Sequence, residues 1–327
     1  MAEMTLIEAI RQGMDEELAR DDRVFITGED VGKRGGVFRA TLGLFDKYGP
    51  DRVIDSPLAE LSIVGVGIGA ALYGLRPICE IQFADFIYPA INQIISEAAK
   101  MYYRSNGEWT VPLVIRAPYG GGIGGGLYHS QSLEAIFAHV PGLKVVIPSN
   151  PADAKGLLKS AVRDPNPVVF FEPKKGYRLI KGLVPEGEYT VPIGPAQVTR
   201  AGSDLSVFAY GMMHYYCLQA AEKLAAEGVQ VEVVDLRTLY PVDKAAILAS
   251  VRKTGKALVV YEDNLTLGYG AEVAAIIADE AFTSLDAPVK RLAAPDVPAV
   301  PFSHPMQDWF MPNPEKIAGA MRELAAY

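Results

Sequence analysis

Lys144-Val145-Val146-Ile147, the segment Pro151 to Arg163, and Val168-Val169-Phe170-Phe171 together form the stretch that decides the fold. The first and last runs are almost continuous in apolar residues, which is typical of strands covered on both faces. The segment between them has the spacing of a helix. A strand, a helix and a second strand in this order predict a parallel pair joined by a crossover helix.

The same alternation extends toward the N-terminus. Further short apolar runs read as strands over Val24 to Thr27, Arg52 to Ile54, Pro77 to Ile81 and Leu113 to Arg116. Helical patterns such as Pro89 to Arg104 separate most of them. The first half of the chain is therefore predicted to form a parallel sheet with helices on both faces, an α/β fold.

A stretch rich in Pro and Gly, about residues 182–200, interrupts this pattern. The alternation then restarts, with strands expected at Leu205 to Ala209, Val229 to Asp235, Ala257 to Tyr261 and Val289 to Leu292, and helices at Tyr216 to Gly228 and Ala271 to Ala281. We expect an α/β domain over residues 1–190 and a smaller α/β domain over residues 191–327.

Composition limits the function. Half of the 327 residues are hydrophobic and 21% are charged, as in soluble globular proteins, and the net charge of −8 argues against nucleic acid as the main partner. Cys79 and Cys217 are expected to be reduced thiols. The N-terminal segment Met1 to Asp22 is expected to be an acidic amphipathic helix, and it resembles neither a signal peptide nor a transit peptide. The most apolar stretch, Leu61 to Leu75, contains glycines and is shorter than the roughly 18 residues of a membrane span, so we expect a cytoplasmic protein without a membrane anchor.

Two glycine motifs match dinucleotide-binding patterns by spelling. Gly65 to Ala70 fits GxGxxA, and Gly120 to Gly126 contains GxGxxG. The fingerprint has physical meaning only where it follows a first strand and opens a helix. The first motif lies inside a helical pattern, and the second runs into Leu127 to Ser130 without a helix start. A non-catalytic dinucleotide-binding redox partner therefore stays an alternative with weak support.

Polar groups follow the ends of the expected strands. Glu29 and Asp30 follow the first strand, and the segment Asp55 to Glu60 follows the second. Gln82 to Phe86 follow the third, and the glycine run leading to His129 follows the fourth. Ligands of open parallel sheets gather beyond the carboxyl ends of the strands, so two carboxylates, an aromatic segment and a histidine should converge at one rim.

Several segments closely resemble the beta subunits of thiamine-diphosphate-dependent 2-oxo acid dehydrogenases: Ser56 to Glu60, Glu80 to Phe86, Tyr128 to Ser132 and Phe170 to Lys174. Val234 to Thr238 and Gly268 to Glu272 resemble the second domain of the same family. The resemblance implies a thiamine-pyrimidine-binding parallel-sheet domain followed by a smaller domain like the C-terminal domain of transketolase. Gln82 to Phe86 and Tyr128 to Ser132 are closer to the branched-chain (2-oxoisovalerate) type than to the pyruvate type.

The resemblance also implies a cofactor pocket. Glu60 matches the carboxylate that lies against a pyrimidine ring nitrogen of thiamine diphosphate, and Phe86 matches the aromatic residue that packs against the ring. Leu58, Ala59 and Gln82 line the same pocket, and Glu29 matches a residue close to the ring and to Glu60. Two neighbouring carboxylates raise the pKa of one of them, which suits a glutamate that shares a proton.

For the substrate, the resemblance implies contacts with His129 and with Phe83, Ala84, Asp85 and Phe86. His129 matches the active-site histidine, whose pKa range suits proton donation during acyl transfer to a lipoyl group. His139, His214 and His304 are expected to be structural residues.

The metal of the diphosphate is expected elsewhere. Thiamine enzymes hold Mg²⁺ with a Gly-Asp-Gly sequence, which this chain lacks. The natural inference is an alpha subunit that holds Mg²⁺, in an α2β2 heterotetramer, with small-residue helices such as Ile63 to Ala71 as packing surfaces. Family analogy adds a structural potassium ion, expected near Leu113, Ala161, Val162, Asp164 and Asn166.

The leading hypothesis is oxidative decarboxylation of branched-chain 2-oxo acids, with acyl transfer to the lipoyl domain of a dihydrolipoyl acyltransferase. Activity is expected only together with the alpha subunit. A pyruvate or acetoin dehydrogenase beta subunit is the alternative within the family. A transketolase-like synthase is a further alternative, although such enzymes usually carry the Mg²⁺ motif in the same chain.

Overall fold

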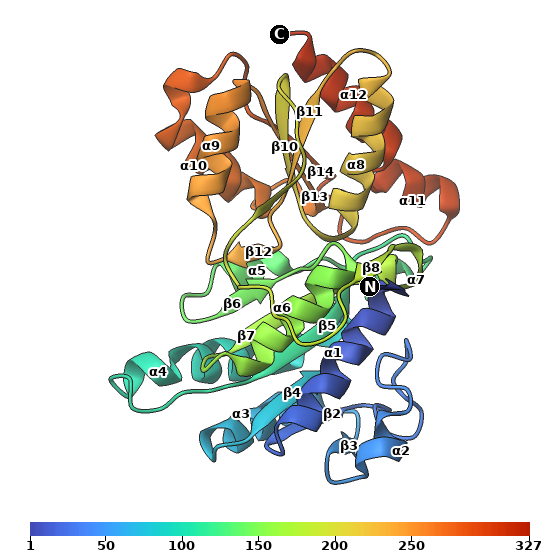
Figure 1. Ribbon diagram of the computed structural model, residues 1–327, viewed down its shortest axis with the longest axis vertical. Helices are drawn as coiled ribbons and strands as arrows, with labels where there is room; N and C mark the ends of the chain where they lie inside the picture. The colour runs from blue at the N-terminus through green and yellow to red at the C-terminus, as the bar shows by residue number, and fades with distance from the viewer. The chain divides into compact units, whose positions relative to one another are not determined.

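The computed structural model describes residues 1–327, which form two compact units (Figure 1). The first unit comprises Met1–Tyr119 and Ile136–Ile193, and the second comprises Gly120–Ala135 and Gly194–Tyr327. The segment Gly120–Ala135 thus leaves the first half of the sequence to join the second unit. The boundary near residue 190 between two domains stays a prediction.

The first unit contains a parallel sheet in which each neighbouring pair runs in the same direction. Its strands run in the order β6-β7-β5-β4-β2-β3. Their bounds are β2 Val24–Gly28, β3 Val53–Asp55, β4 Arg76–Glu80, β5 Val114–Tyr119, β6 Lys144–Val146 and β7 Val168–Pro173. Every residue of β2, β5 and β7 is buried. The sheet and its strands therefore agree with the apolar runs of the sequence.

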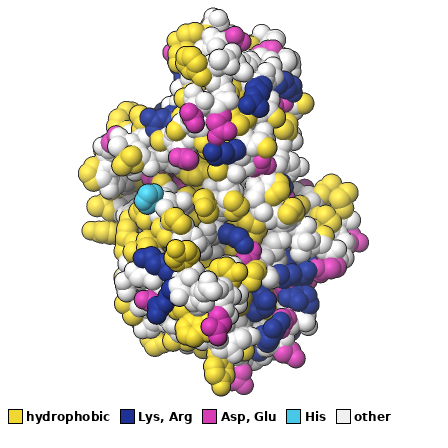
Figure 2. Space-filling view, turned by 90° about the vertical axis from the view of Figure 1, so that its left-hand side faces the viewer, with side chains coloured by type: hydrophobic (Ala, Val, Ile, Leu, Met, Phe, Trp, Pro, Cys, Tyr) yellow, Lys and Arg dark blue, Asp and Glu magenta, His cyan; other side chains and the backbone are white.

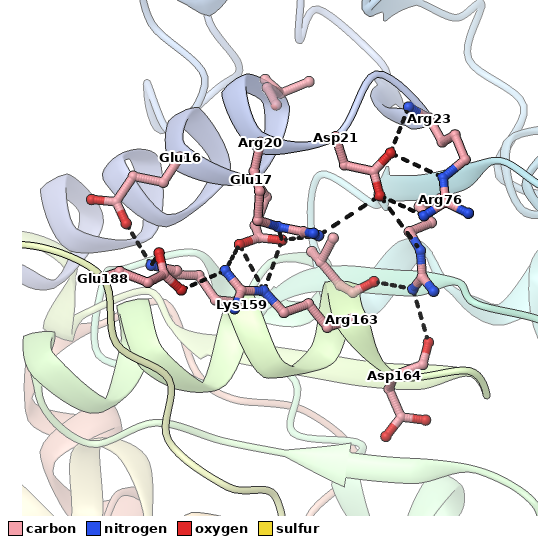
Figure 3. Close-up of polar contacts among 12 residues, drawn as sticks. Glu16, Glu17, Arg20, Asp21, Arg23, Arg76, Lys159, Arg163, Asp164 and Glu188 are labelled. Atoms are coloured by element: carbon pink, nitrogen blue, oxygen red, sulfur yellow. Dashed lines mark hydrogen bonds and ion pairs between the residues drawn. The ribbon is translucent and has the colours of Figure 1, made fainter.

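Two long helices, α1 (Leu6–Arg20) and α6 (Pro151–Arg163), lie side by side against this sheet (Figure 1). The side chain of Thr5 and that of Glu8 form a capping box at the start of α1. Ion pairs join the two helices, including Lys159 Nζ to Glu16 Oε2 at 2.6 Å (Figure 3). The other helices of the first half are α2 Leu44–Tyr48, α3 Glu60–Leu72, α4 Met101–Arg104, α5 Glu134–Ala138 and α7 Gly176–Leu179.

Two local expectations were wrong. The helix expected over Pro89 to Arg104 is a chain of short turns: 3₁₀ at Tyr88–Ala90, π at Asn92–Glu97, 3₁₀ at Ala98–Lys100, and then α4. Hydrophobic periodicity over so few turns does not separate these three helix types. The residues before α1 do not extend the helix, because Ala2–Thr5 form β1, antiparallel to β8 (Lys181–Val184).

The second unit has a five-stranded sheet in the order β14-β13-β10-β11-β9, in which only the edge strand β9 is antiparallel. Figure 1 shows α8 and α12 on one face of the sheet, and α9 and α10 on the other. The bounds of its strands are β9 Gln197–Arg200, β10 Leu205–Ala209, β11 Val231–Asp235, β13 Ala257–Asn264 and β14 Lys290–Ala294. A further short strand, β12 (Thr238–Tyr240), lies outside this sheet. The helix bounds are α8 Gly211–Ala225, α9 Lys244–Thr254, α10 Gly270–Glu280, α11 His304–Phe310 and α12 Pro314–Ala325. Two α/β units of this kind confirm the predicted fold class.

Both cysteines are free and buried, as expected, and burial raises the pKa of each thiol. None of the helices combines the length and the apolarity needed to cross a membrane.

A buried network of charges connects three strands of the first sheet. Arg116 on β5 donates through Nη1 to Glu80 Oε2 on β4 at 2.7 Å, and through Nε to Glu172 Oε1 on β7 at 2.6 Å. Tyr177 donates its hydroxyl proton to Glu172. The side chain of Arg116 is fully buried, and burial raises the pKa of Glu80 although the guanidinium opposes this shift. Each charge is compensated by hydrogen bonds, as buried ions require.

Replacing Arg116 by Met should destabilise the fold, because it leaves two buried carboxylates facing each other without a cation. We expect the free energy of unfolding to fall by about 3–5 kcal/mol, measured by urea denaturation of the purified chain. Lowering the pH should restore part of this loss, since protonation removes the uncompensated charges. Arg104→Met is the matched control: its side chain is 58% exposed and pairs with Glu97 at 3.3 Å, so the loss should stay below about 1 kcal/mol. Similar losses in the two variants would contradict the proposed importance of the network.

Candidate active site

The loops after β2, β3 and β4 meet at the carboxyl end of the first sheet. Ser56 N–H donates to the carbonyl of Gly28 at 2.8 Å, and Gly32 N–H donates to Asp55 Oδ1 at 2.6 Å. Gln82 donates through Nε2 to the carbonyl of Glu29 at 3.4 Å. These bonds place Glu29, the segment leading to Glu60, and Gln82 around one small region. The predicted convergence of these three loops is therefore present in the structure.

A glycine is needed where β2 reaches this rim. A Cβ atom on Gly28 would lie 2.8 Å from the carbonyl oxygen of Glu80, closer than real Cβ atoms approach a backbone atom. The missing side chain lets the end of β2 lie against β4. Glu29, the next residue, is thereby held beside the segment that follows β4.

Glu29 and Glu60 form the electrostatic centre of the region. Glu60 is the first residue of α3, and both glutamates are partly exposed. Burial raises the pKa of Glu29, and the charges of Asp30 and Glu60 raise it further. One carboxyl of a neighbouring pair thus takes a proton more readily than an isolated glutamate does.

An aromatic cluster borders the carboxylates. The ring of Phe83 packs edge-on against Phe38 and Phe86, with centroids 5.2 and 5.4 Å apart. Ala84–Phe86 form a 3₁₀ turn in which Ala84 and Asp85 are buried while Phe86 keeps part of its surface. Leu58 is 73% exposed. Phe86 and Leu58 therefore offer surface to a ligand, whereas Phe83, Ala84 and Asp85 offer little in this conformation.

Charged groups support this turn from within the sheet. Lys174 Nζ lies 5.5 Å from the centre of the Phe83 ring and 3.9 Å from Asp85 Oδ2. The network of Arg116 adjoins this turn along the chain, because Glu80 precedes the turn by a few residues. Neither Arg116 nor Lys174 was predicted from the sequence as a residue of the site. Opposite charges inside three neighbouring apolar strands are the signal that could have revealed the network.

His129 belongs to the second unit. Its loop is closed by a hydrogen bond from Gly120 N–H to the carbonyl of Gln131, at 2.9 Å. The convergence of His129 with Glu29 and Glu60 stays a prediction. The loop leads only into a short 3₁₀ turn at Gly126–Tyr128, and Gly65 to Ala70 lie inside α3, so neither glycine motif has the strand-and-helix context of a dinucleotide site.

Two of the five residues expected around a potassium ion, Val162 and Asp164, bind the guanidinium of Arg76 through their backbone carbonyls; Figure 3 shows Arg76 beside Asp164. Arg76 Nη1 donates to the carbonyls of Val162 at 2.7 Å and Asp164 at 3.4 Å. The carboxylate of Asp164 forms an ion pair with Lys144 and accepts the N–H of Asn166. The carbonyl of Leu113 accepts the N–H of Val168, and that of Ala161 accepts the N–H of Asp164. The Oδ1 atom of Asn166 is buried without a hydrogen-bond partner, and the potassium site stays a prediction.

Two other histidines and the possible metal ligands were also located. His214 is buried, with Nε2 2.8 Å from Thr199 Oγ1, as expected for a structural histidine. His304 begins α11. No three His, Cys, Asp or Glu side chains are grouped as a metal site.

Known proteins identify the two units. The transketolase pyrimidine binding domain matches residues 2–180, and the transketolase C-terminal domain matches residues 194–317. A solved structure titled "Split gene transketolase, inactive beta4 tetramer" has the same fold, with a TM-score of 0.79 and 23% identity over 99% of this chain and 98% of that one. This pair of domains defines the class as the thiamine-diphosphate-dependent enzymes of the transketolase type.

Full-length relatives narrow the class to a family. The chain is 59% identical over 327 residues to the 2-oxoisovalerate dehydrogenase subunit beta of Bacillus subtilis, covering 100% of both chains. It is 49% identical, with the same coverage, to the pyruvate dehydrogenase E1 component subunit beta of that organism. The 2-oxoisovalerate dehydrogenase subunit beta of Pseudomonas aeruginosa is 44% identical over 98% of this chain and 95% of its own. The chain belongs to the family of 2-oxo acid dehydrogenase beta subunits, which are parts of oxidoreductases, and the resemblance seen in the sequence is confirmed.

The interaction between Glu29 and its neighbours can be measured without cofactor. Because the charges of Asp30 and Glu60 both raise the pKa of Glu29, Asp30→Asn and Glu60→Gln should each lower it, and Asp30→Asn should lower it more. Carboxyl ¹³C chemical shifts during a pH titration report this pKa. Asp22→Asn, which changes a fully exposed acid, is the control and should leave the pKa unchanged. An unchanged pKa of Glu29 in Glu60→Gln would mean that the two carboxylates do not interact.

Proposed function

We propose that this chain is the beta half of the decarboxylating component that acts on branched-chain 2-oxo acids and transfers the acyl group to a lipoyl domain. The identity of 59% to a 2-oxoisovalerate dehydrogenase beta subunit, against 49% to a pyruvate dehydrogenase beta subunit of the same organism, is the observation that carries this choice. The spelling of Gln82 to Phe86 and of Tyr128 to Ser132 supports the same choice. Pyruvate and acetoin remain the alternative substrates within the family.

The region around Glu29 and Glu60 fits the pyrimidine end of thiamine diphosphate. Bound cofactor supplies a thiazolium carbanion and an electron sink for decarboxylation. Glu60 would accept a hydrogen bond from a pyrimidine ring nitrogen when that nitrogen carries a proton. Glu29, whose pKa is raised, would take a proton more readily than an isolated glutamate and so limit the negative charge of the pair. Phe86 would pack on the ring, while Leu58, Ala59 and Gln82 complete the wall. The raised pKa of Glu29 and the surface offered by Phe86 and Leu58 support this assignment.

His129 is proposed as the proton donor of acyl transfer. When the acyl carbon bonds to one sulfur of the lipoyl dithiolane, the S–S bond breaks and the other sulfur takes a proton. An imidazolium near neutral pH can supply that proton. The substrate is proposed to contact His129 and the turn Phe83 to Phe86, with Phe86 as the main contact of the turn, because Phe83, Ala84 and Asp85 are buried.

An alpha subunit is proposed to hold the diphosphate and its Mg²⁺ in an α2β2 assembly, with the acyltransferase and its lipoyl domain as the further partner. The missing Gly-Asp-Gly sequence supports this division. Exposed apolar side chains on and after α3 also support a covering partner, since Val66 is 63% and Tyr73 is 92% exposed. Figure 2 shows that hydrophobic side chains are exposed over much of one face. A structural potassium ion near Leu113, Ala161, Val162, Asp164 and Asn166 stays part of the proposal, supported by the buried Oδ1 of Asn166, which has no hydrogen-bond partner. We place the complex in the cytoplasm.

Reconstitution tests the half-site. The purified chain alone should be inactive, because the diphosphate site lies on the partner. The complex with an alpha subunit should decarboxylate branched-chain 2-oxo acids in a thiamine-dependent reaction, faster than pyruvate or acetoin. A substrate panel with an artificial electron acceptor measures this. In the same complex Glu60→Ala should lower the rate by at least about 100-fold, because cofactor activation is lost. Full activity of Glu60→Ala would contradict the pocket, and a preference for pyruvate would contradict only the substrate.

His129→Ala separates the two half-reactions. Decarboxylation measured with an artificial acceptor should fall little, whereas reductive acylation of a lipoyl domain should fall by about 10²–10⁴-fold, the usual contribution of a positioned general acid. His214→Ala is the matched control, because His214 lies in the same unit but is a buried structural residue. Equal loss of both steps in His129→Ala would overturn the proposed role.

A further inference from the structure

The loop from Gly120 to Gln131 lacks rigidity of its own. Four of its residues have φ between +59° and +89°, a region that favours glycine, and all four are glycines: Gly120, Gly122, Gly124 and Gly126. Only a short 3₁₀ turn is present within it. Glycine-rich backbone loses the most conformational entropy when it is ordered, so contacts from outside must hold this loop in one conformation.

One such contact is a carboxylate on β13. Glu262 is buried, and its Oε1 accepts the N–H of Gly121 at 2.6 Å. A carboxylate bound to a backbone N–H forms a short, charge-assisted hydrogen bond, roughly twice as strong as a neutral one. The packing is tight, because a Cβ atom on Gly120 would lie 2.6 Å from the same oxygen. Glu262 therefore fixes the first residues of the loop, Gly120 and Gly121.

The far side of the loop is held by the segment 300–311. Gln307 Oε1 accepts the N–H of Gly124 at 3.2 Å, and the ring of Phe302 covers Gly126 so closely that a Cβ atom there would lie 2.3 Å from it. His129 belongs to the same loop and packs against Gly125, since a Cβ atom on Gly125 would lie 2.8 Å from His129 Cβ. The conformation of the loop thus determines where the imidazole is held.

We propose that Glu262 is a positioning residue, which holds the imidazole of His129 in place by anchoring the glycine loop through Gly121. The assignment of a catalytic purpose to this anchor rests on the proposed function, whereas the anchoring itself does not. Glu262 touches neither the substrate nor the cofactor in this proposal. It acts by removing alternative conformations of the loop, which is how a catalytic group is preorganised.

Amide hydrogen exchange on the full-length chain tests the anchor without any activity. In Glu262→Ala the amides of residues 121–131 should exchange about tenfold faster or more, as expected for the loss of one charge-assisted hydrogen bond. Glu262→Gln keeps an acceptor oxygen but loses the charge, so its exchange should lie between that of the unmodified chain and that of Glu262→Ala. Glu315→Ala is the control, because Glu315 is an exposed acid of the same unit that pairs with Lys223. Should Glu262→Ala not fold, Glu262→Asp withdraws the carboxylate by one methylene and should give the same faster exchange.

Unchanged exchange in the loop would overturn the proposal, and so would faster exchange spread equally over β10 and β11, since that indicates general destabilisation.

The catalytic purpose is tested in the complex with the alpha subunit. Glu262→Ala should lower lipoyl acylation about tenfold more than decarboxylation, with partial rescue by Glu262→Gln. Equal loss in both steps would overturn the positioning of His129. If His129→Ala itself leaves acylation intact, the proposed role of His129 fails, while the exchange result still decides whether Glu262 anchors the loop.

Discussion

The guanidinium of Arg116, buried between Glu80 and Glu172, ties three strands of the first unit to one another. Three charges inside an apolar sheet are costly unless each is paired, and the pairing requires β4, β5 and β7 to keep one mutual register. Glu80 and Glu172 stand close to the carboxyl ends of β4 and β7. The segments that follow these strands, Gln82 to Phe86 and Lys174, therefore start from fixed points. A network of this kind is weak evidence for stability, but it specifies geometry where a cofactor pocket needs it.

Much of the fold could be predicted because most strands of both sheets are short apolar runs, which fit a buried strand better than a loop or an exposed helix. Pro151 to Arg163 was predicted with the bounds that the structure has. The failures occur where local pattern does not determine the outcome. Ala2–Thr5 form a strand only because β8 is available more than 170 residues later. Gly120–Ala135 leave their sequence neighbours for the second unit, which depends on tertiary contacts such as the bond from Gly121 to Glu262.

The candidate site was predictable to the extent that it follows from parallel-sheet geometry. Glu29, Glu60 and Gln82 follow three neighbouring strands, and the structure brings their loops together. The expectation that one carboxyl of the pair has a raised pKa agrees with Glu29. The potassium donors could not be judged from residue types, because backbone carbonyls carry no sequence signal. Arg76, which binds two of those carbonyls, lies about ninety residues away in the sequence.

The two kinds of functional group in this chain are supported in different ways, and the proposed chemistry explains why. A cofactor ring is small and stays bound, so its carboxylates can sit on loops fixed by a sheet and a buried ion network. A lipoyl domain would be a whole folded partner that must arrive and leave, so the histidine proposed to serve it needs a loop able to adapt. A glycine-rich loop provides that adaptability at the cost of precision. An anchor such as Glu262, on a rigid strand beside the loop, restores precision at one end and leaves the exposed part around Tyr128 accessible to the partner.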